Sequence, residues 1–304
     1  MENSLAIIIL NYCNYKLTEE CVNNLIKLNV QSRIIVVDNN SKNGSYEYLS
    51  KALFNYENVD VIENNINAGY SAGNNFGIRY AFKKYENIRY IAIMNPDVII
   101  TYKEILSNII NKLDSKDDIA AAGALMVYKN EVDFEGSYWN IPTKLEVVFE
   151  NCNWTRLMFN KRNHKRIGAI SDWNGNAKVG VLPGSFFIIK ADVLKEIGLF
   201  DEGTFLYNEE NILAIRLREK GYGEMLSTTD FYIHNHNPSI ITKKTLKKYY
   251  NLVKVNYQSR KYLCDTYYRN KLVSFTLTCV QVINYFDMTV RFFGGFIKRK
   301  LKSR

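Results

Sequence analysis

The first half of the chain alternates short apolar segments with segments of helical length, and this alternation limits the fold more than any other feature. The apolar segments are LAIIIL (5–10), RIIVVD (33–38), NVDVIE (58–63), RYIAIMN (89–95) and IAAAGALMV (119–127). Buried strands separated by helices form mostly parallel sheets that are covered by helices on both faces. We therefore expect an α/β fold of this kind, with further strands at 182–190 and 231–236.

Polar side chains follow the predicted strands at the point where each one ends. These stretches are Asn11-Tyr12, Asp38 to Asn40, Asn64 to Gly69 and Asn95 to Asp97. Ligands of open α/β sheets bind outside the carboxyl ends of the strands. Gly69 and Gly73 leave room for close backbone approach there, and we expect the next helix over 74–84. The alternative for each stretch is an ordinary turn or helix cap.

Asp97 follows the stiff Pro96 and is a candidate hard oxygen ligand for a Mg²⁺ or Mn²⁺ that bridges a diphosphate, with an ordinary Asp turn as the alternative. Two common nucleotide signatures are missing, because neither GxGxxG after the first strand nor GxxxxGK[ST] occurs. This argues against a dinucleotide dehydrogenase and a P-loop NTPase. A sugar nucleotidyltransferase would carry a glycine-rich loop with Arg and Lys where Asn11 and Tyr12 stand.

Two acids and two histidines near the end of the α/β segment are further candidates. Glu209 and Glu210 begin a predicted helix over 208–222, where the helix dipole favours carboxylates, and one of them is a candidate general base. Adjacent helical residues point about 100° apart, so we expect one acid to face the site. His234 and His236 share one face of a strand. Metal binding and an ordinary surface position remain alternatives for them.

The order of these segments resembles the family-2 glycosyltransferases, and within them the rhamnosyltransferase-like branch that builds bacterial surface polysaccharides. The matching stretches are AIIILNYCNY, IIVVDNNS, NAGYSAGNNFGI, IAIMNPDV, LPGSFFIIK and GLFDEGTFLYNEEN followed by R and GY, between about residues 4 and 240. The resemblance implies the GT-A fold, which is Rossmann-like. It also implies an inverting transfer from a nucleotide-sugar donor to an acceptor hydroxyl without a covalent intermediate.

The resemblance also assigns roles to individual positions. Asp97 matches the last acid of the family's DxD motif and would ligate Mg²⁺ or Mn²⁺, with Asn95 replacing the first acid. Glu210 falls on the base position, with Glu209 as the alternative, and Arg216 matches a following Arg. His234 or His236 would join the metal or the diphosphate. The expected donor contacts are Asn11, Tyr12, Asp38, Asn40, Asn67, Gly69, Asn74, Asn95 and Asp97.

Two departures from the family pattern leave a second hypothesis open. Glu210 stands where Asp is usual, and Ile212 where a further Asp is frequent. The alternative is a catalytically inactive sugar-nucleotide-binding or assembly protein. For an active enzyme, dTDP-rhamnose is the first choice of donor and a UDP-sugar the second, with a glycan or a lipid-diphosphate-linked acceptor.

The expected domains are a GT-A domain over 1–242 and a basic helical extension over 243–304. An insertion over about 129–181 interrupts the first and holds all three tryptophans. Aromatic rings suit the apolar faces of sugars, so Trp173 and Tyr207 are expected at the acceptor site, with core packing as the alternative.

The extension carries 15 Lys and Arg against two acids, a net charge of +13, whereas 1–242 carries −4. Its longest uncharged stretch, 272–286, is too short for a membrane span but is amphipathic. We expect 272–304 to bind an anionic membrane surface. The alternatives are packing on the catalytic domain or on a second subunit, as in a homodimer. No nucleic-acid motif accompanies the charge. Scattered cysteines and the lack of a signal peptide favour the cytoplasm, at the inner face of the membrane.

Overall fold

The computed structural model describes residues 4–160, 175–235 and 245–302. Their contacts form two units. The sheet unit contains 4–141, 175–202 and 209–235, and the helical unit contains 142–160, 203–208 and 245–302. The helical unit thus takes in part of the predicted insertion. The predicted boundary after residue 242 lies outside the described residues.

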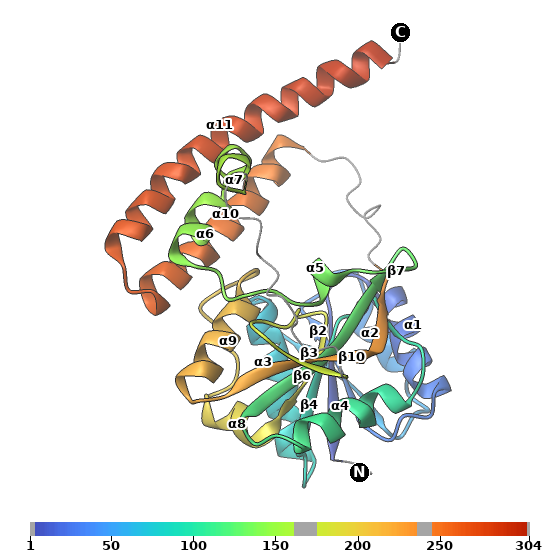
Figure 1. Cartoon of the computed structure of the whole chain (residues 1–304). Coiled ribbons are helices and arrows are strands. Elements are labelled where there is room, and N and C mark those ends of the chain that lie inside the picture. Colours follow the sequence, from blue (N-terminus) through green and yellow to red (C-terminus); the bar gives the residue numbers. More distant parts are fainter. Residues whose placement is uncertain (1–3, 161–174, 236–244, 303–304) are drawn as a thin grey trace. The chain divides into compact units, whose positions relative to one another are not determined.

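A ten-stranded sheet forms the centre of the sheet unit (Figure 1). Eight strands follow the order β3-β2-β1-β4-β9-β6-β10-β5, while β7 pairs with β6 and β8 with β10. The first four in this order are parallel, and β10 is parallel to β6. The strands are β1 (Leu5–Asn11), β2 (Arg33–Asn39), β3 (Val59–Asn64), β4 (Tyr90–Met94), β5 (Val98–Ile100), β6 (Ile119–Tyr128), β7 (Glu131–Val132), β8 (Asn176–Val179), β9 (Phe186–Lys190) and β10 (Gly223–His234).

Helices cover both faces of this sheet, as the unbroken apolar strands predicted. Alternate residues of β1 face opposite ways, so that Ile7 and Ile9 pack into one buried cluster and Ala6 and Ile8 into the other. The first cluster includes residues of α1 and α4, and the second includes residues of α3, α8 and α9. The helices of this unit are α1 (Tyr15–Lys27), α2 (Ser45–Ala52), α3 (Tyr70–Lys84), α4 (Glu104–Asp114), α5 (Phe134–Ser137), α8 (Ala191–Glu196) and α9 (Glu209–Glu219).

Three sequence-based boundaries were wrong. The strand predicted over 182–190 begins only at Phe186, because the preceding LPG segment bonds to side chains instead of a neighbouring strand. The helix predicted over 74–84 begins earlier, at Tyr70, after the left-handed Gly69. The strand predicted over 231–236 is the end of β10, which already starts at Gly223.

The helical unit consists of α-helices and one π-helical turn (Figure 1). Its long last helix, α11, packs against α10, α6 and α7. No helix among the described residues is long and apolar enough to cross a bilayer. The elements are α6 (Lys144–Phe149), α7 (Asn153–Asn160), α10 (Leu246–Tyr262), the π-turn Leu263–Tyr267 and α11 (Lys271–Lys302).

Candidate functional site

Asn11 and Asp38 join the ends of β1 and β2. They are register partners, and Nδ2 of Asn11 donates a hydrogen bond to Oδ1 of Asp38 at 2.6 Å. The other carboxylate oxygen accepts from the backbone N–H of Ser41 at 2.9 Å, and the Thr18 hydroxyl donates to Oδ1 of Asn11 at 2.9 Å. Both side chains are buried. They therefore hold the two strand ends and the following loop in place.

Tyr12 and Asn40 are the more accessible side chains beside this buried pair. Tyr12 is 58% exposed and Asn40 is half-buried. Asn40 has a φ of +60°, a left-handed conformation that Asn tolerates better than most residues. Of the donor contacts predicted at these two strand ends, these two offer surface to a ligand directly.

Asn39 links the ends of β2 and β3 and was not among the predicted site residues. Its Nδ2 donates to Oδ1 of Asn67 at 3.1 Å, and its Oδ1 accepts from Nδ2 of Asn64 at 2.9 Å. Oδ1 of Asn67 also accepts from the backbone N–H of Gly69 at 3.1 Å. The consecutive asparagines after Asp38 were the sequence signal for this amide cluster.

The start of α3 lies very close to β1. Gly69 has a φ of +108°, which favours glycine, and a Cβ at Gly73 would meet Cδ1 of Leu10 at 2.6 Å. Nδ2 of Asn74 donates to the backbone oxygen of Tyr70 at 3.0 Å. The glycines of NAGYSAGNN therefore allow the start of α3 to lie against the end of β1, which agrees with the close backbone approach that the sequence predicted.

Tyr70 connects the predicted donor and base segments and was not predicted from the sequence. Its hydroxyl donates to the backbone oxygen of Gly184 at 2.6 Å and lies 3.3 Å from Oδ1 of Asn95. Burial, followed by the negative charges of Glu210 and Glu209, raises the pKa of Tyr70 well above its usual range. The phenol therefore stays a neutral donor. Its position directly after Gly69 was the only signal.

Glu210 is held against the LPG loop. Its Oε1 accepts a hydrogen bond from the backbone N–H of Gly184 at 3.3 Å, and a Cβ at Gly184 would lie 2.8 Å from that oxygen. Burial raises the pKa of Glu210. Glu209 is also buried. Further along α9, Nη1 of Arg216 donates to the backbone oxygen of Leu199 at 2.6 Å, so this arginine holds the turn that follows α8.

Glu224, at the start of β10, holds the other end of the same loop. Its Oε2 accepts from the backbone N–H of Leu182 at 2.6 Å, and its side chain is buried. Burial raises the pKa of Glu224 to about 8. Two acids thus anchor the LPG segment, one near each end, and sequence analysis had singled out only Glu210.

Asp97 and His234 meet where β5 pairs with β10. Nε2 of His234 lies 3.2 Å from Oδ2 of Asp97, and the backbone N–H of Asn235 donates to the backbone oxygen of Asp97 at 2.8 Å. The carboxylate of Asp97 is a suitable ligand for Mg²⁺ or Mn²⁺, and the imidazole of His234 is a further nitrogen ligand beside it. The described residues hold no group of three or more His, Cys, Asp or Glu that could bind a metal. This pair would therefore need further ligands, such as diphosphate oxygens.

The remaining predicted residues are only partly described. His236 and Trp173 lie outside the described residues. Tyr207 belongs to the helical unit, where it is 38% exposed and adopts a φ of +76°. In the sheet unit, Nε1 of Trp139 donates to Oδ1 of Asn211 on α9 at 2.8 Å, which indicates a structural role for that ring.

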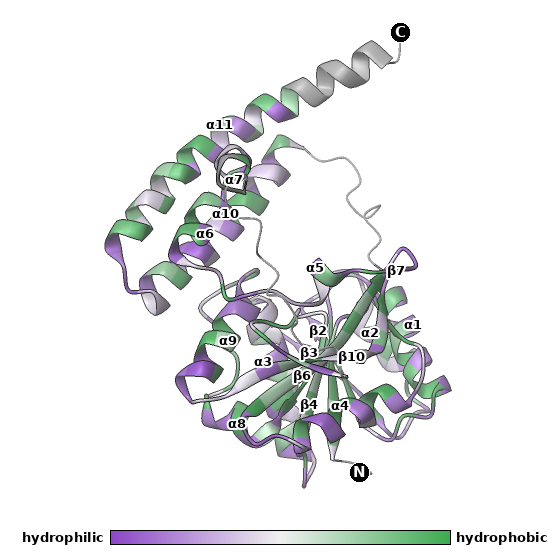
Figure 2. Ribbon diagram, viewed as in Figure 1, coloured by the Kyte–Doolittle hydropathy of each residue, from purple (hydrophilic) through white to green (hydrophobic). Residues whose placement is uncertain are grey.

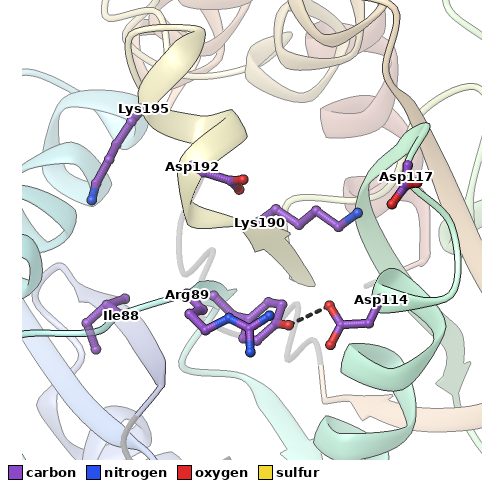
Figure 3. Close-up of a pocket in the computed structure, with 8 residues that line it drawn as sticks. Ile88, Arg89, Asp114, Asp117, Lys190, Asp192 and Lys195 are labelled. Atoms are coloured by element: carbon purple, nitrogen blue, oxygen red, sulfur yellow. Dashed lines mark hydrogen bonds between the residues drawn. The ribbon is translucent and has the colours of Figure 1, made fainter.

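A pocket of about 600 Å³, whose lining residues are shown in Figure 3, lies at the start of β4, the end of this strand opposite to the candidate site. Tyr90, which begins β4, lines it, whereas Asn95 follows the end of that strand. Its lining combines three cations and three acids: Arg89, Lys190, Lys195, Asp114, Asp117 and Asp192. None of the predicted site residues lines this pocket, so it is separate from the candidate site.

The family follows from the sequence match. The profile of glycosyl transferase family 2 matches residues 4–198. The chain belongs to this family. This confirms the predicted resemblance, and the matched range includes the strand ends and the LPG loop but not Glu210 or His234.

Curated relatives of this family-2 chain include two named transferases. The Haloferax volcanii low-salt glycan biosynthesis hexosyltransferase Agl10 is 24% identical over 72% of this chain and 63% of its own length. The Escherichia coli K12 rhamnosyltransferase WbbL is 25% identical over 71% of this chain and 77% of its own. This chain therefore spans less than two thirds of the length of the Haloferax relative.

Two solved structures share the fold. The mannosyltransferase PcManGT from Pyrobaculum calidifontis, in complex with GDP-Man and Mn²⁺, has a TM-score of 0.53 at 11% identity and covers 92% of this chain and 74% of its own. GalNAc-T7 with UDP, GalNAc and Mn²⁺ has a TM-score of 0.58 at 17% identity, covering 84% of this chain and 48% of its own. The predicted GT-A fold is confirmed.

Proposed function

We propose that this family-2 chain is an inverting, metal-dependent glycosyltransferase of cell-surface polysaccharide synthesis. It transfers a sugar from a nucleotide-sugar to a hydroxyl of a glycan or lipid-diphosphate-linked acceptor. The observation that carries the proposal is the placing of three groups around the end of β4. These are the Asp97–His234 pair, the side-chain amide of Asn95, and the Glu210 carboxylate. Hydrogen bonds connect Asn95 to Tyr70, Tyr70 to Gly184, and Gly184 to Glu210.

Asp97 and His234 are the proposed metal-binding residues. They would hold a divalent cation, which when bound would offset the charge that grows on the leaving diphosphate. The two solved structures described above are both complexes with Mn²⁺. Tyr12, Asn40 and the amides around Asn67 are the proposed donor contacts, since they surround the neighbouring strand ends.

Glu210 is the proposed base that removes the proton from the acceptor hydroxyl. Its raised pKa makes the carboxylate a better proton acceptor than an ordinary glutamate, provided that it is ionised. Inversion follows when the acceptor oxygen attacks the anomeric carbon from the face opposite the nucleotide. Gly184 keeps the carboxylate in position with its backbone N–H.

For the donor we propose dTDP-rhamnose first and a UDP-sugar second. The rhamnosyltransferase name of the Escherichia coli relative supports the first, and the UDP in the GalNAc-T7 structure supports the second. The second candidate function is an inactive sugar-nucleotide-binding protein, which the glutamate at 210 and Ile212 favour. The proposed location is the cytoplasmic face of the membrane.

A thermal-shift screen of nucleoside diphosphates and nucleotide-sugars, with and without Mn²⁺ or Mg²⁺, tests the donor site. A ligand at 100 times its dissociation constant stabilises the folded state by about 2.7 kcal/mol. We expect one nucleotide to give a metal-dependent shift that Asp97→Ala and His234→Ala reduce. Asp117→Ala, an exposed acid of the opposite pocket, is the matched control and should behave like the wild type.

The outcomes separate the two functions. A metal-dependent shift together with hydrolysis or transfer of the donor supports the enzyme. A shift without any turnover supports the inactive binding protein. No shift with any nucleotide contradicts both, and an unchanged shift in Asp97→Ala contradicts the metal site.

A further inference from the structure

Helix α11 buries polar side chains against its own unit. Ser274, Gln281, Asn284 and Asp287 are each at most 7% exposed, and they recur every three to seven residues along one side of the helix. Nδ2 of Asn284 donates to the backbone oxygen of Asn151 at 2.6 Å. Nδ2 of Asn151 in turn donates to Oε1 of Gln281 at 2.8 Å. These bonds fix which side of α11 faces inward.

The opposite side of α11, here called the outer face, is apolar and exposed. Its residues recur at intervals of mostly three or four and are between 41% and 73% exposed, and Figure 2 shows apolar residues along this helix. They are Leu272, Phe275, Val282, Ile283, Phe286, Val290 and Phe293. Trp154 of α7 widens the face, since its ring meets that of Phe286 edge-on at 6.2 Å and is itself exposed. Contiguous exposed apolar surface of this kind marks an interaction site.

We propose that the outer face is seated on an anionic membrane surface, with α11 lying in the plane of the interface. The charges of the unit support a lipid partner. The only charged residue between 272 and 290 is Asp287, which is buried, so the outer face carries no charge along that length. Beyond it the sequence FFGGFIKRKLKSR places aromatic residues beside basic ones, as in interfacial helices.

The absence of charge also argues against a second copy of the chain as the occupant. Helices that pair in water usually border their apolar seam with charged residues that select the partner. Between 272 and 290 the positions of α11 that border the outer face are uncharged, among them Thr276, Thr278, Tyr285 and Thr289, and the charge of Arg291 just beyond is paired with Asp287 at 2.8 Å. The net charge of +13 over 243–304 supplies attraction to anionic lipid headgroups but would oppose the close pairing of two identical segments.

This surface deepens the proposed membrane location and does not depend on the transfer reaction. A lipid-diphosphate-linked acceptor is confined to the same surface, so docking through α11 would bring the enzyme to it. Vesicle binding without nucleotide therefore tests the docking face alone, and donor hydrolysis in solution tests the enzyme alone.

The experiment compares flotation of the full chain with vesicles of phosphatidylcholine alone and with vesicles that also contain phosphatidylglycerol. We expect flotation with the anionic vesicles and little with the neutral ones. The double variant Phe275→Glu/Phe286→Glu should bind the anionic vesicles at least tenfold less tightly. Phe54→Glu, on a residue of the sheet unit that is 83% exposed, is the matched control and should float like the wild type.

Three results would overturn the proposal. The wild type could fail to float with anionic vesicles, or the double variant could float as well as the Phe54→Glu control. The third is a wild-type dimer in analytical ultracentrifugation that the double variant converts to a monomer while vesicle binding stays unchanged. That result would assign the outer face to a second copy. Equal circular dichroism spectra and equal thermal unfolding temperatures in both variants show that each is folded.

Discussion

The backbone N–H of Gly184 donates a hydrogen bond to Oε1 of Glu210 at 3.3 Å, in a space that a Cβ on residue 184 would fill. Gly184 lies in the LPG loop, which is distant in sequence from Glu210. The backbone oxygen of Gly184 also accepts a hydrogen bond from the hydroxyl of Tyr70. The Glu210 carboxylate can therefore lie beside the end of β4 only because residue 184 is a glycine.

Gly184→Ala should displace the Glu210 carboxylate. The added methyl group would lie 2.8 Å from Oε1, closer than real Cβ contacts, while the fold should survive because the acid lies at the end of a flexible side chain. The hydrogen bond from Gly184 lowers the pKa of Glu210, against the larger effect of burial. Losing that bond raises the pKa further.

We therefore expect Gly184→Ala to have a lower kcat than the wild type. We also expect the acid limb of its pH profile of kcat to move to higher pH. A pH series of donor turnover measures both. The control is Gly221→Ala, because nothing lies within 4 Å of the added methyl group, although the left-handed φ of +86° at this position adds some strain. Gly203→Ala is unsuitable as a control because Tyr262 would clash with its methyl group. A profile that coincides with the wild type would show that the contact does not position the base.

Glu210→Gln and Glu209→Gln decide which acid is the base. General-base catalysis contributes about 10²- to 10⁴-fold to the rate. We expect Glu210→Gln to lower kcat within that range with little change in donor binding, and Glu209→Gln to lower it much less. Steady-state kinetics and the thermal shift with donor separate the two effects. The reverse order of kcat values would assign the base to Glu209.

Glu224→Gln should change the pH dependence of stability. Burial raises the pKa of Glu224 to about 8, with the charge of Glu210 adding to it and that of Arg218 opposing it. Below the pKa of the unfolded state, the acid is protonated in both states and its contribution to folding is complete. As the pH rises towards 8 the unfolded state ionises first, so the free energy of unfolding falls by about 1.4 kcal/mol per unit of pKa shift.

The glutamine variant keeps an acceptor for the backbone N–H of Leu182 and has no proton to lose. Its free energy of unfolding should match the wild type below pH 4.5 and exceed it at pH 8, as chemical denaturation at several pH values would measure. Glu63→Gln, on a strand-end glutamate whose side chain is exposed, serves as the control. A parallel pH dependence in Glu224→Gln and wild type would contradict the buried, raised-pKa state of this acid.

The sequence by itself determined the sheet, its helical cover and the strand ends. Apolar runs such as 5–10 and 33–38 are long enough to be buried on both sides, and the polar residues that end them fall at one edge because parallel strands share a direction. The sequence also indicated where the backbone can be approached closely, because Gly69 and Gly73 have no Cβ.

Only the tertiary structure decided which of these side chains meet. His234 contacts Asp97 because β10 pairs with β5 in antiparallel orientation. Glu224 binds the backbone N–H of Leu182 because β10 has twelve residues and begins at Gly223, well before the strand predicted over 231–236. Likewise, the period of α11 revealed an amphipathic helix but not that its polar side faces inward, towards Asn151. Local patterns encode periodicity and turns, whereas contacts between distant segments depend on register and on the partner that each face finds.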